Sequence, residues 1–321
     1  MAQITNVERA KRLRGREPAI RAAMERWKDL RAAGGLRNPP DQFLIRNSFV
    51  ENAVSAGSGS ERRLPKRADR PPATRLVTAQ GSLLQFELAI LAEAQLRTGL
   101  GGAPDNKRPL MVDDTTVDWS DLFPLEAKPT GGRRASYRTV QDLRRDQLVG
   151  NVDKLIERGF LREPDRDPPS TRFDAEGFLL LEENGPRPGY AGDPYLVPKT
   201  PKGCFTIPYS LIENGWLFVL PEAALVMILF AARHYDPDAK DGFVMSAEDR
   251  VRFFGISPST YTQAQMLDTM GVLEVIMDPA RAILGEDTPR DKRRSRPNQL
   301  RLVPEGLDDD ALAVTLAYLE T

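Results

Sequence analysis

Between residues 204 and 303 the apolar positions follow the order of three helices and a hairpin. Residues 223–234 are apolar on nearly every face, which predicts a fully buried helix. Residues 246–255 open on a serine cap with acids in the first turn and close on glycine, which predicts a short second helix. After a third helix, strands at 272–277 and 299–303 flank a long basic excursion. This order predicts a winged helix whose hairpin is the wing.

The third helix is the candidate DNA-reading element of this set. Ser257 is its expected cap, Pro258 its first helical residue and Gly271 its stop. At helical spacing the inward face consists of Thr260, Ala264, Leu267 and Met270. The outward row is polar and uncharged, able to hydrogen-bond base edges in a major groove, and it consists of Ser259, Tyr261, Thr262 and Gln265. The alternative is a helical domain whose outward row is only solvated.

A weaker copy of the same plan precedes this one. Residues 82–98 are strongly apolar and predict a helix, and a short helix is expected near residues 118–123. A long helical stretch at 137–158 ends at Gly159. Three of its apolar residues stand eleven, seven and four positions before that glycine, and they are Leu148, Val152 and Leu155. The inward residues Thr260, Ala264 and Leu267 stand at the same offsets before Gly271, which indicates an internal duplication.

We therefore expect a mainly α protein with small β-hairpins, in the α+β class, built from two winged helix-turn-helix domains in tandem. Residues 1–75 would form a basic, partly helical N-terminal arm with a flexible linker. The first winged-helix domain would span residues 76–185 and the second residues 204–307, joined by a Pro- and Gly-rich linker at 186–203. A helix at 308–321 would pair two copies or pack on its own domain.

Composition and charge add two constraints. The 321 residues are 40% hydrophobic, enough for a core in each domain, and the lone Cys204 excludes an internal disulfide and a thiolate zinc cluster. The net charge of −1 hides an asymmetry, because residues 1–75 hold 17 Lys and Arg against 8 Asp and Glu, and the remainder holds 28 against 38. A basic arm attracts phosphate, whereas an acidic body argues against DNA wrapping the whole surface.

The basic arm is open to several interpretations. Glu17 and Pro18 can open a helix that carries Ile20 and Trp27 on one side. Such a helix would contact DNA or a partner, lie on a membrane surface, or dock on the body through Trp27. Residues 47–72 have linker composition and are expected to be poorly ordered unless DNA or a partner holds them. The sequence shows neither an apolar run long enough for a bilayer nor a signal peptide, so a cytoplasmic, nucleoid-associated protein is expected.

Basic residues near the two third helices are further candidate DNA contacts. In the first copy the candidates are five arginines and one glutamine: Arg133, Arg134, Arg138, Arg144, Arg145 and Gln147. In the second wing the candidates, which would grip phosphate or enter the minor groove, are Arg290, Lys292, Arg293, Arg294 and Arg296. Arginine bonds guanine bidentately or neutralises phosphate, and spacing does not decide between the two. A solvated loop is the alternative for the wing.

The usual residues of catalysis and metal binding are missing from the sequence. It has no glycine motif for phosphate, and its one histidine, His234, ends a buried helix, which excludes a histidine triad or multi-histidine metal site and favours a structural role. Residues 236–242 resemble the start of a calcium-binding loop. The glycine, however, stands at the seventh position of the loop instead of the sixth, and the twelfth position, which requires glutamate, is Ala247. We expect no enzyme activity, cofactor or metal.

A family resemblance agrees with this interpretation. The phrase Phe205-Thr-Ile-Pro-Tyr-Ser-Leu-Ile-Glu-Asn-Gly-Trp216 stands before Leu220-Pro221. With it, residues 205–303 resemble winged-helix domains of bacterial replication initiators, of plasmid RepA type and DnaD-like. The tandem plan is similar to plasmid initiators built from two winged helices. The acidic body departs from that pattern and puts extensive DNA contact in doubt.

The leading hypothesis is sequence-specific binding of double-stranded DNA by a replication initiator or transcriptional regulator of a plasmid or other mobile element. The alternative is a protein-interaction or chromosome-architecture module, because tandem winged helices also bind proteins in condensin-associated dimers. The expected partners are double-stranded DNA, a second copy in a homodimer, and a replication or architectural protein.

Overall fold

The computed structural model describes residues 5–33, 40–53, 64–78, 81–105, 107–111, 117–125, 139–163, 177–186, 192–239, 242–277 and 298–321. The α-helices are α1 (Asn6–Ala33), α2 (Pro72–Leu76), α3 (Leu83–Arg97), α4 (Trp119–Leu122), α5 (Val140–Glu157), α6 (Ser210–Glu213), α7 (Trp216–Val219), α8 (Glu222–Arg233), α9 (Ala247–Phe254), α10 (Pro258–Tyr261), α11 (Gln263–Thr269) and α13 (Ala311–Glu320). The 3-10 turns are η1 (Asn47–Phe49), η2 (Arg67–Asp69) and η4 (Pro304–Asp308).

The strands form small antiparallel sheets, and they are β1 (Gln42–Arg46), β2 (Leu161–Arg162), β3 (Leu179–Leu180), β4 (Cys204–Pro208), β5 (Phe243–Val244), β6 (Leu273–Ile276) and β7 (Gln299–Leu302). In the described part of the chain β1 pairs with β4, β2 pairs with β3, and the third sheet has the order β5-β7-β6. Helices joined by short antiparallel sheets confirm the expected α+β class.

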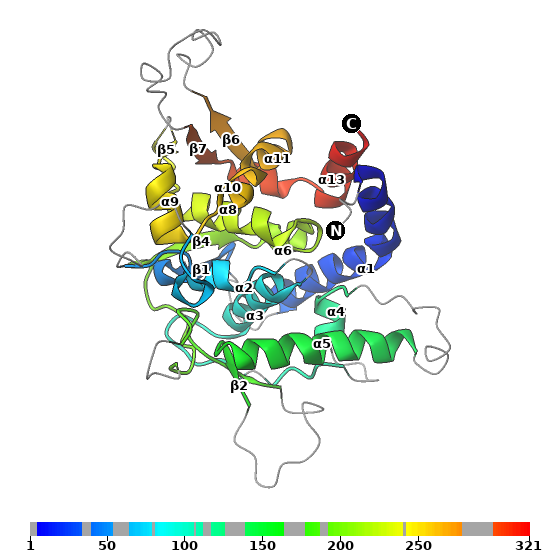
Figure 1. Ribbon diagram of the computed structural model, residues 1–321. Coiled ribbons are helices and arrows are strands. Elements are labelled where there is room, and N and C mark those ends of the chain that lie inside the picture. Colours follow the sequence, from blue (N-terminus) through cyan, green and yellow to red (C-terminus); the bar gives the residue numbers. More distant parts are fainter. Residues whose placement is uncertain are drawn as a thin grey trace, which may run out of the picture.

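Four helices give the molecule its layers (Figure 1). The contacts run from α5 to α3, from α3 to α8, and from α8 to α10 and α11, so α5 and α11 lie on opposite sides of the central pair. The central pair is the most apolar part of the chain: Leu88 in α3 and Ile228 in α8 are both fully buried, as are most of their helical neighbours. A helix that is apolar on every face can only be stable between other elements.

Helix α1 begins earlier than the sequence predicts. It starts at Asn6 and runs through Pro18, whereas Pro18 was expected to open it. Pro18 has no N–H to donate to the helix. The helix continues through it because Ala10 and Leu13, which precede Pro18, are also buried against the rest of the protein. At the other end Trp27 is fully buried and donates Nε1–H to the Leu122 carbonyl at 2.9 Å. Helix α1 is thus docked through Trp27, one of the three alternatives.

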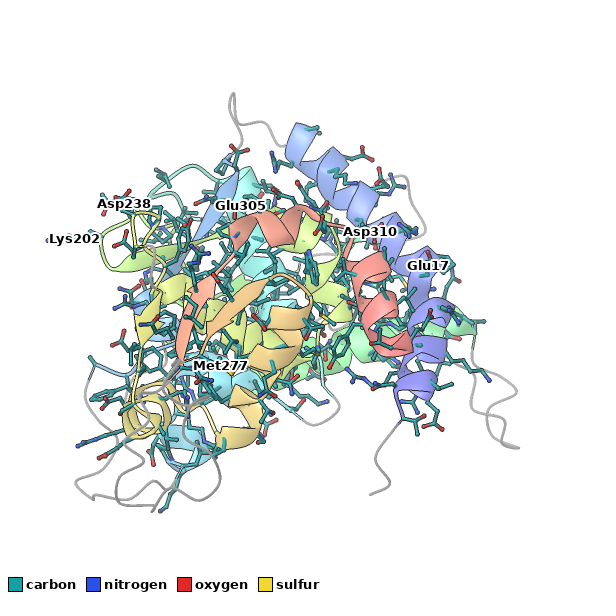
Figure 2. The ribbon with its side chains drawn as sticks, turned by 90° about the horizontal axis from the view of Figure 1, so that it is seen from above. Glu17, Lys202, Asp238, Met277, Glu305 and Asp310 are labelled. Atoms are coloured by element: carbon teal, nitrogen blue, oxygen red, sulfur yellow. The ribbon has the colours of Figure 1, made fainter. Side chains whose placement is uncertain are left out.

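Ion pairs fasten α1 to acidic residues from later in the chain. Arg14 pairs with Glu320 and Arg21 with Asp310 of the C-terminal helix, and Arg31 pairs with Glu213 at 2.9 Å. Figure 2 shows α13 lying along α1, with Asp310 and Glu17 labelled. Of the two alternatives for the C-terminal helix, the structure shows packing on its own chain.

Strand β1 ties the predicted arm to the second half of the chain. Its register places Phe43 opposite Ile207 and Ile45 opposite Phe205, and all four side chains are buried. Within residues 47–72, which were expected to be poorly ordered, residues 47–53 and 64–72 are described and include η1 and η2; residues 54–63 lie outside the described ranges. Apolar residues such as Phe49, which is fully buried, outweigh the linker-like composition here.

The segment expected as a linker also contributes to the core. Tyr195 and Val197 are each 1% exposed, and the Tyr195 hydroxyl accepts a hydrogen bond from Gln95 Nε2 at 2.9 Å. Just before it, the fully buried Glu183 accepts from the Arg46 backbone N–H at 3.0 Å and pairs with the Arg46 guanidinium. Residues 187–191 lie outside the described ranges.

The N-termini of α3 and α8 meet at one carboxylate. Glu222, the first residue of α8, accepts backbone N–H bonds from Thr78 and Leu84, both at 2.8 Å. In return Gln85 Nε2 donates to the Leu220 carbonyl at 3.0 Å. Burial raises the pKa of Glu222 to about 7, although the two backbone donors oppose the shift. The carboxyl group therefore joins two helix ends whose dipoles both favour negative charge.

Two buried glutamates of α3 differ in their surroundings. Glu93 is 1% exposed and accepts from Arg97 Nη2 at 3.0 Å and from Arg108 Nε at 2.9 Å. Glu87 is fully buried, yet neither of its carboxyl oxygens has a hydrogen-bond partner. Burial, reinforced by the charge of Glu183, raises the pKa of Glu87 well above its ordinary value. A protonated but unpaired carboxyl group lowers the stability of the fold.

Replacing Glu87 should stabilise the protein. Glu87→Met keeps the length of the side chain and removes an unsatisfied polar group, so the free energy of unfolding at pH 7 should rise by about 1–3 kcal/mol. The matched control on the same helix is Glu93→Met, which leaves Arg108 without its carboxylate and Arg97 with only Asp105, and should destabilise by about 3–5 kcal/mol. Denaturant unfolding of both variants measures the difference. A loss of stability in Glu87→Met would contradict this account.

The raised pKa of Glu222 predicts a pH-dependent difference. The folded state holds the Glu222 proton more tightly than the unfolded chain, so this contribution is complete below about pH 4.5 and is lost as pH rises through about 7. Glu222→Gln resembles the protonated form at every pH. From pH 4.5 to pH 8 its stability should therefore rise relative to the unmodified protein by up to about 3 kcal/mol. Parallel pH profiles in denaturant unfolding would show that Glu222 does not titrate in this range.

Candidate nucleic-acid interface

The two predicted third helices end in the same way. After α5, Gly159 adopts a φ of 71°, its N–H bonds the Ile156 carbonyl, and the Phe160 N–H bonds the Leu155 carbonyl. After α11, Gly271 has a φ of 75° and makes the matching bond to Asp268, while Val272 bonds Leu267. This is the Schellman pattern, in which glycine takes the left-handed position. The seven predicted inward residues, Met270 included, are buried except for Thr260, which is half-buried.

The hairpins that follow have matching registers. Leu161 lies opposite Leu180 in the first, and Leu273 lies opposite Leu302 in the second. In each hairpin the residue after the glycine accepts a backbone bond, Phe160 from Leu181 and Val272 from Val303, both at 3.0 Å. The residues at matching offsets in the sequence therefore also make matching hydrogen bonds at the two helix ends and hairpins.

The predicted outward row is only partly exposed. Ser259, Thr262 and Gln265 are exposed, but Tyr261 is half-buried because the Arg250 guanidinium lies over its ring, 3.4 Å from the centroid. The expected single helix is also interrupted at Thr262, which separates α10 from α11 and whose hydroxyl bonds the Ser259 carbonyl at 2.7 Å. Tyr261 thus packs against Arg250 while standing in the row, and the exposed members of the row are Ser259, Thr262 and Gln265.

The candidates of the first copy lie on α5 or outside the described ranges. Arg145 and Gln147 are exposed and Arg144 is half-buried. The sequence of α5 contains three basic residues and four acidic ones, so the helix itself gives little attraction for phosphate. The basic candidates outside the described residues are Arg133, Arg134, Arg138, Arg290, Lys292, Arg293, Arg294 and Arg296.

A cluster of arginines lies where α2 meets the end of α5. Arg67 donates to the Arg75 and Val77 carbonyls, and Arg158 donates to the Arg75 carbonyl at 3.1 Å. Burial lowers the pKa of Arg70, Arg75 and Arg158, and the charge of Arg67 lowers the pKa of Arg70 and Arg158 further. Two of these guanidinium groups cap the carbonyl end of α2, a favourable position for positive charge.

His234 has the structural surroundings that its position predicted. Its ring stacks on Phe243 with centroids 4.5 Å apart, and its Nδ1 lies 2.9 Å from the Phe230 carbonyl oxygen. Burial lowers the pKa of His234, which favours the neutral ring.

The described residues contain no group of three or more His, Cys, Asp or Glu side chains suited to a metal ion. Within the same ranges, no helix is both long enough and apolar enough to span a membrane.

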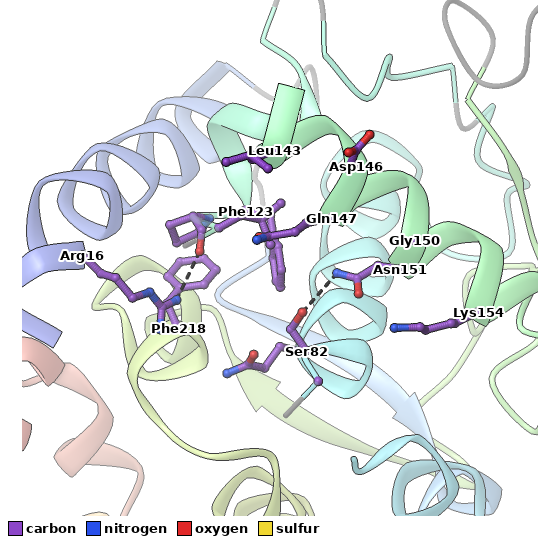
Figure 3. A pocket seen from close by; sticks show the side chains of 14 residues that line it. Arg16, Ser82, Phe123, Leu143, Asp146, Gln147, Gly150, Asn151, Lys154 and Phe218 are labelled. Atoms are coloured by element: carbon purple, nitrogen blue, oxygen red, sulfur yellow. Dashed lines mark hydrogen bonds between the residues drawn. The ribbon is translucent and has the colours of Figure 1, made fainter. Parts of the chain in front are cut away.

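A pocket of about 680 Å³ opens beside α5, between α5, α7, the start of α3 and α1 (Figure 3). Its walls include Phe123 and Phe218, with Gly150 and Asn151 on α5. Asn151 is 7% exposed and its Nδ2 donates to Ser82 Oγ at 3.0 Å, which ties α5 to the start of α3. Gln147, predicted to face a DNA groove, contributes to this wall.

Sequence reasoning did not identify this pocket or the buried acids. Gly150 is the residue from which the pocket could have been suspected. A glycine inside a long helical pattern lowers helix stability, so its presence usually reflects a packing or functional role. Glu87 and Glu222 carried no local signal, because their burial depends on elements distant in the sequence.

Comparisons of this chain with protein-family models, with curated proteins and with solved structures find no match.

Proposed function

We propose that the chain is a double-stranded DNA-binding protein made of two winged-helix units, acting as a replication initiator or transcriptional regulator. The observation that carries the proposal is the repeated unit: a buried first helix, a short second helix, a third helix closed by a Schellman glycine, and an antiparallel hairpin in matching register. In the second unit the sheet order β5-β7-β6 places the hairpin strand β7 in the centre, as a winged helix requires.

Chemistry at the surface supports the same proposal. Ser259, Thr262 and Gln265 provide exposed hydroxyl and amide groups that suit base edges, and Arg145 offers a charged donor on the first unit. Helix α1 adds the exposed Lys11 and Arg12, which are not among the ion-paired residues of the described chain. Contact with phosphate would come from such exposed cations and from the basic residues within 133–138 and 290–296.

The arrangement of the two units determines how DNA would be held. Because α5 and α11 lie on opposite sides of α3 and α8, their outward faces point away from each other (Figure 1). Two such faces do not fit the grooves of one straight duplex. Each unit would therefore bind its own stretch of DNA, so that one chain holds two duplex segments.

The test begins with DNA from the protein's host. Purified protein is incubated with sheared genomic DNA at about physiological salt, where weak surface attraction is screened, and the retained fragments are sequenced. A few sharp peaks support an initiator or regulator. Uniform recovery, or none, would overturn sequence-specific binding.

Charge reversal in the wing gives a prediction on those fragments. Arg293→Glu with Arg294→Glu should weaken binding to every fragment and flatten the salt dependence, because phosphate contacts are lost. Gln265→Ala should instead change the preference among fragments, because a base contact is lost. Fluorescence anisotropy against salt concentration measures both. Unchanged affinity in the double reversal would remove the wing from the interface.

Bridging of two duplexes is a separate prediction. Protein on an immobilised duplex should capture a second, labelled duplex. Arg145→Glu on α5 and Thr262→Glu at the α10–α11 junction should each abolish capture while single-duplex binding persists through the other unit. If either variant still captures the second duplex, then bridging does not depend on the two opposite faces of one chain.

A protein-binding role is the second candidate, and one observation favours it. Across α10 and α11 the only charged residue is Asp268, so this surface offers phosphate no cation of its own. Binding to unrelated duplex that falls steeply with salt would support DNA, and no binding even at low salt would support a protein partner.

A further inference from the structure

The pocket beside α5 has the size and boundaries of a small-molecule site. Its volume of about 680 Å³ falls inside the range of roughly 300–1,000 Å³ that such sites occupy. Four helices contribute to it, with α1 and α7 on one side and α5 facing the start of α3 on the other (Figure 3). Such a junction between packed elements holds its shape better than a groove formed by loops.

A glycine on α5 keeps the pocket open. Gly150 lies in the interior of the helix, where glycine costs stability relative to alanine. A Cβ built at Gly150 would meet no atom within 4 Å, so neither close packing nor backbone conformation explains the glycine. Any larger side chain at this position would project into space that the pocket now provides.

The lining combines an aromatic floor with a positive rim. Phe123 and Phe218 are 3% and 2% exposed, and their rings meet edge to face with centroids 6.1 Å apart. Around them the charged lining residues are the cations Arg16 and Lys154 and one carboxylate, Asp146, which leaves one positive charge in excess. Lys154 is exposed, and Arg16 donates Nη2 to the Pro124 carbonyl at 3.2 Å, which directs its side chain to the pocket edge.

We propose that this pocket binds a small aromatic anion, with its rings against Phe123 and Phe218 and its acidic group toward Lys154 and Arg16. Seven of the fourteen lining residues are polar or charged, so a ligand would be held by hydrogen bonds and charge as well as by apolar contact. The ligand would contact α5 over about three turns, from Leu143 to Lys154. It would thereby act on the helix that carries Arg145, whether or not that helix binds DNA.

The probe for this site is anilinonaphthalene sulfonate, an aromatic anion that fluoresces in apolar surroundings. The folded protein should give a saturable titration with one dominant site. Uncharged anilinonaphthalene has the same rings without the sulfonate and should bind more weakly. If it binds as tightly as the sulfonate, the preference for an anion is overturned, and the absence of a saturable signal overturns the site.

Two glycine variants separate a pocket effect from a folding effect. Gly150→Leu should fill the cavity and weaken the sulfonate probe by at least about tenfold. Gly15→Leu is the matched control, because Gly15 also lies inside a helix with no atom within 4 Å of a built Cβ but is absent from the pocket lining. Its titration should match that of the unmodified protein. Equal affinity in Gly150→Leu and the unmodified protein would overturn the proposal.

Charge reversal at the rim tests the orientation of the ligand. Lys154→Glu changes an exposed side chain, so the fold should persist, and the affinity for the sulfonate probe should fall several-fold while that for the uncharged probe stays the same. Thermal unfolding of each variant confirms that a folded protein is being titrated. An equal fall for both probes would overturn the role of Lys154 in holding the acidic group.

Discussion

The arrangement of this molecule depends on the carboxyl group of Glu222, which joins the start of α8 to the start of α3. Two helix N-termini placed together present several backbone N–H groups and two positive dipole ends to the same volume. The Glu222 carboxylate accepts from one of those groups, the Leu84 N–H of α3, and also from the Thr78 N–H that precedes α3, while the Gln85 amide donates to the Leu220 carbonyl. Helices α5 and α11 lie on opposite sides of this pair because α5 packs on α3 and α11 packs on α8.

Ion pairs within the chain account for part of the charge asymmetry of the sequence. Basic residues of the first 75 positions pair with acidic residues of the body, as Arg21 does with Asp310, Arg31 with Glu213 and Arg46 with Glu183. A strongly basic segment followed by an acidic one is commonly associated with nucleic acid. Here part of that charge complementarity joins two parts of the same chain, and fewer cations remain for phosphate.

Local patterns predicted several helices. Periodicity placed α3, α5 and α8, and Gly159 and Gly271 were expected as helix stops, because these features depend on residues close together in the chain. Features that depend on distant residues could not be predicted in this way. The pairing of β1 with β4 and the burial of Tyr195 arise from tertiary contacts that overrode the linker composition. Tyr261 stands at its predicted position in the outward row, and its contact with Arg250 of the neighbouring helix is a tertiary feature that helical spacing does not reveal.

The β1–β4 sheet also sets an order of events during synthesis. Residues 42–46 leave the ribosome long before residues 204–208, so the apolar side chains of Phe43 and Ile45 have no strand partner until most of the chain has been made. Contacts between residues far apart in sequence form slowly because a long loop must close first. During that interval an unpaired, apolar strand is exposed to other chains. A chaperone that holds the nascent N-terminal segment would therefore improve the yield of native protein, more than stabilising any one helix would.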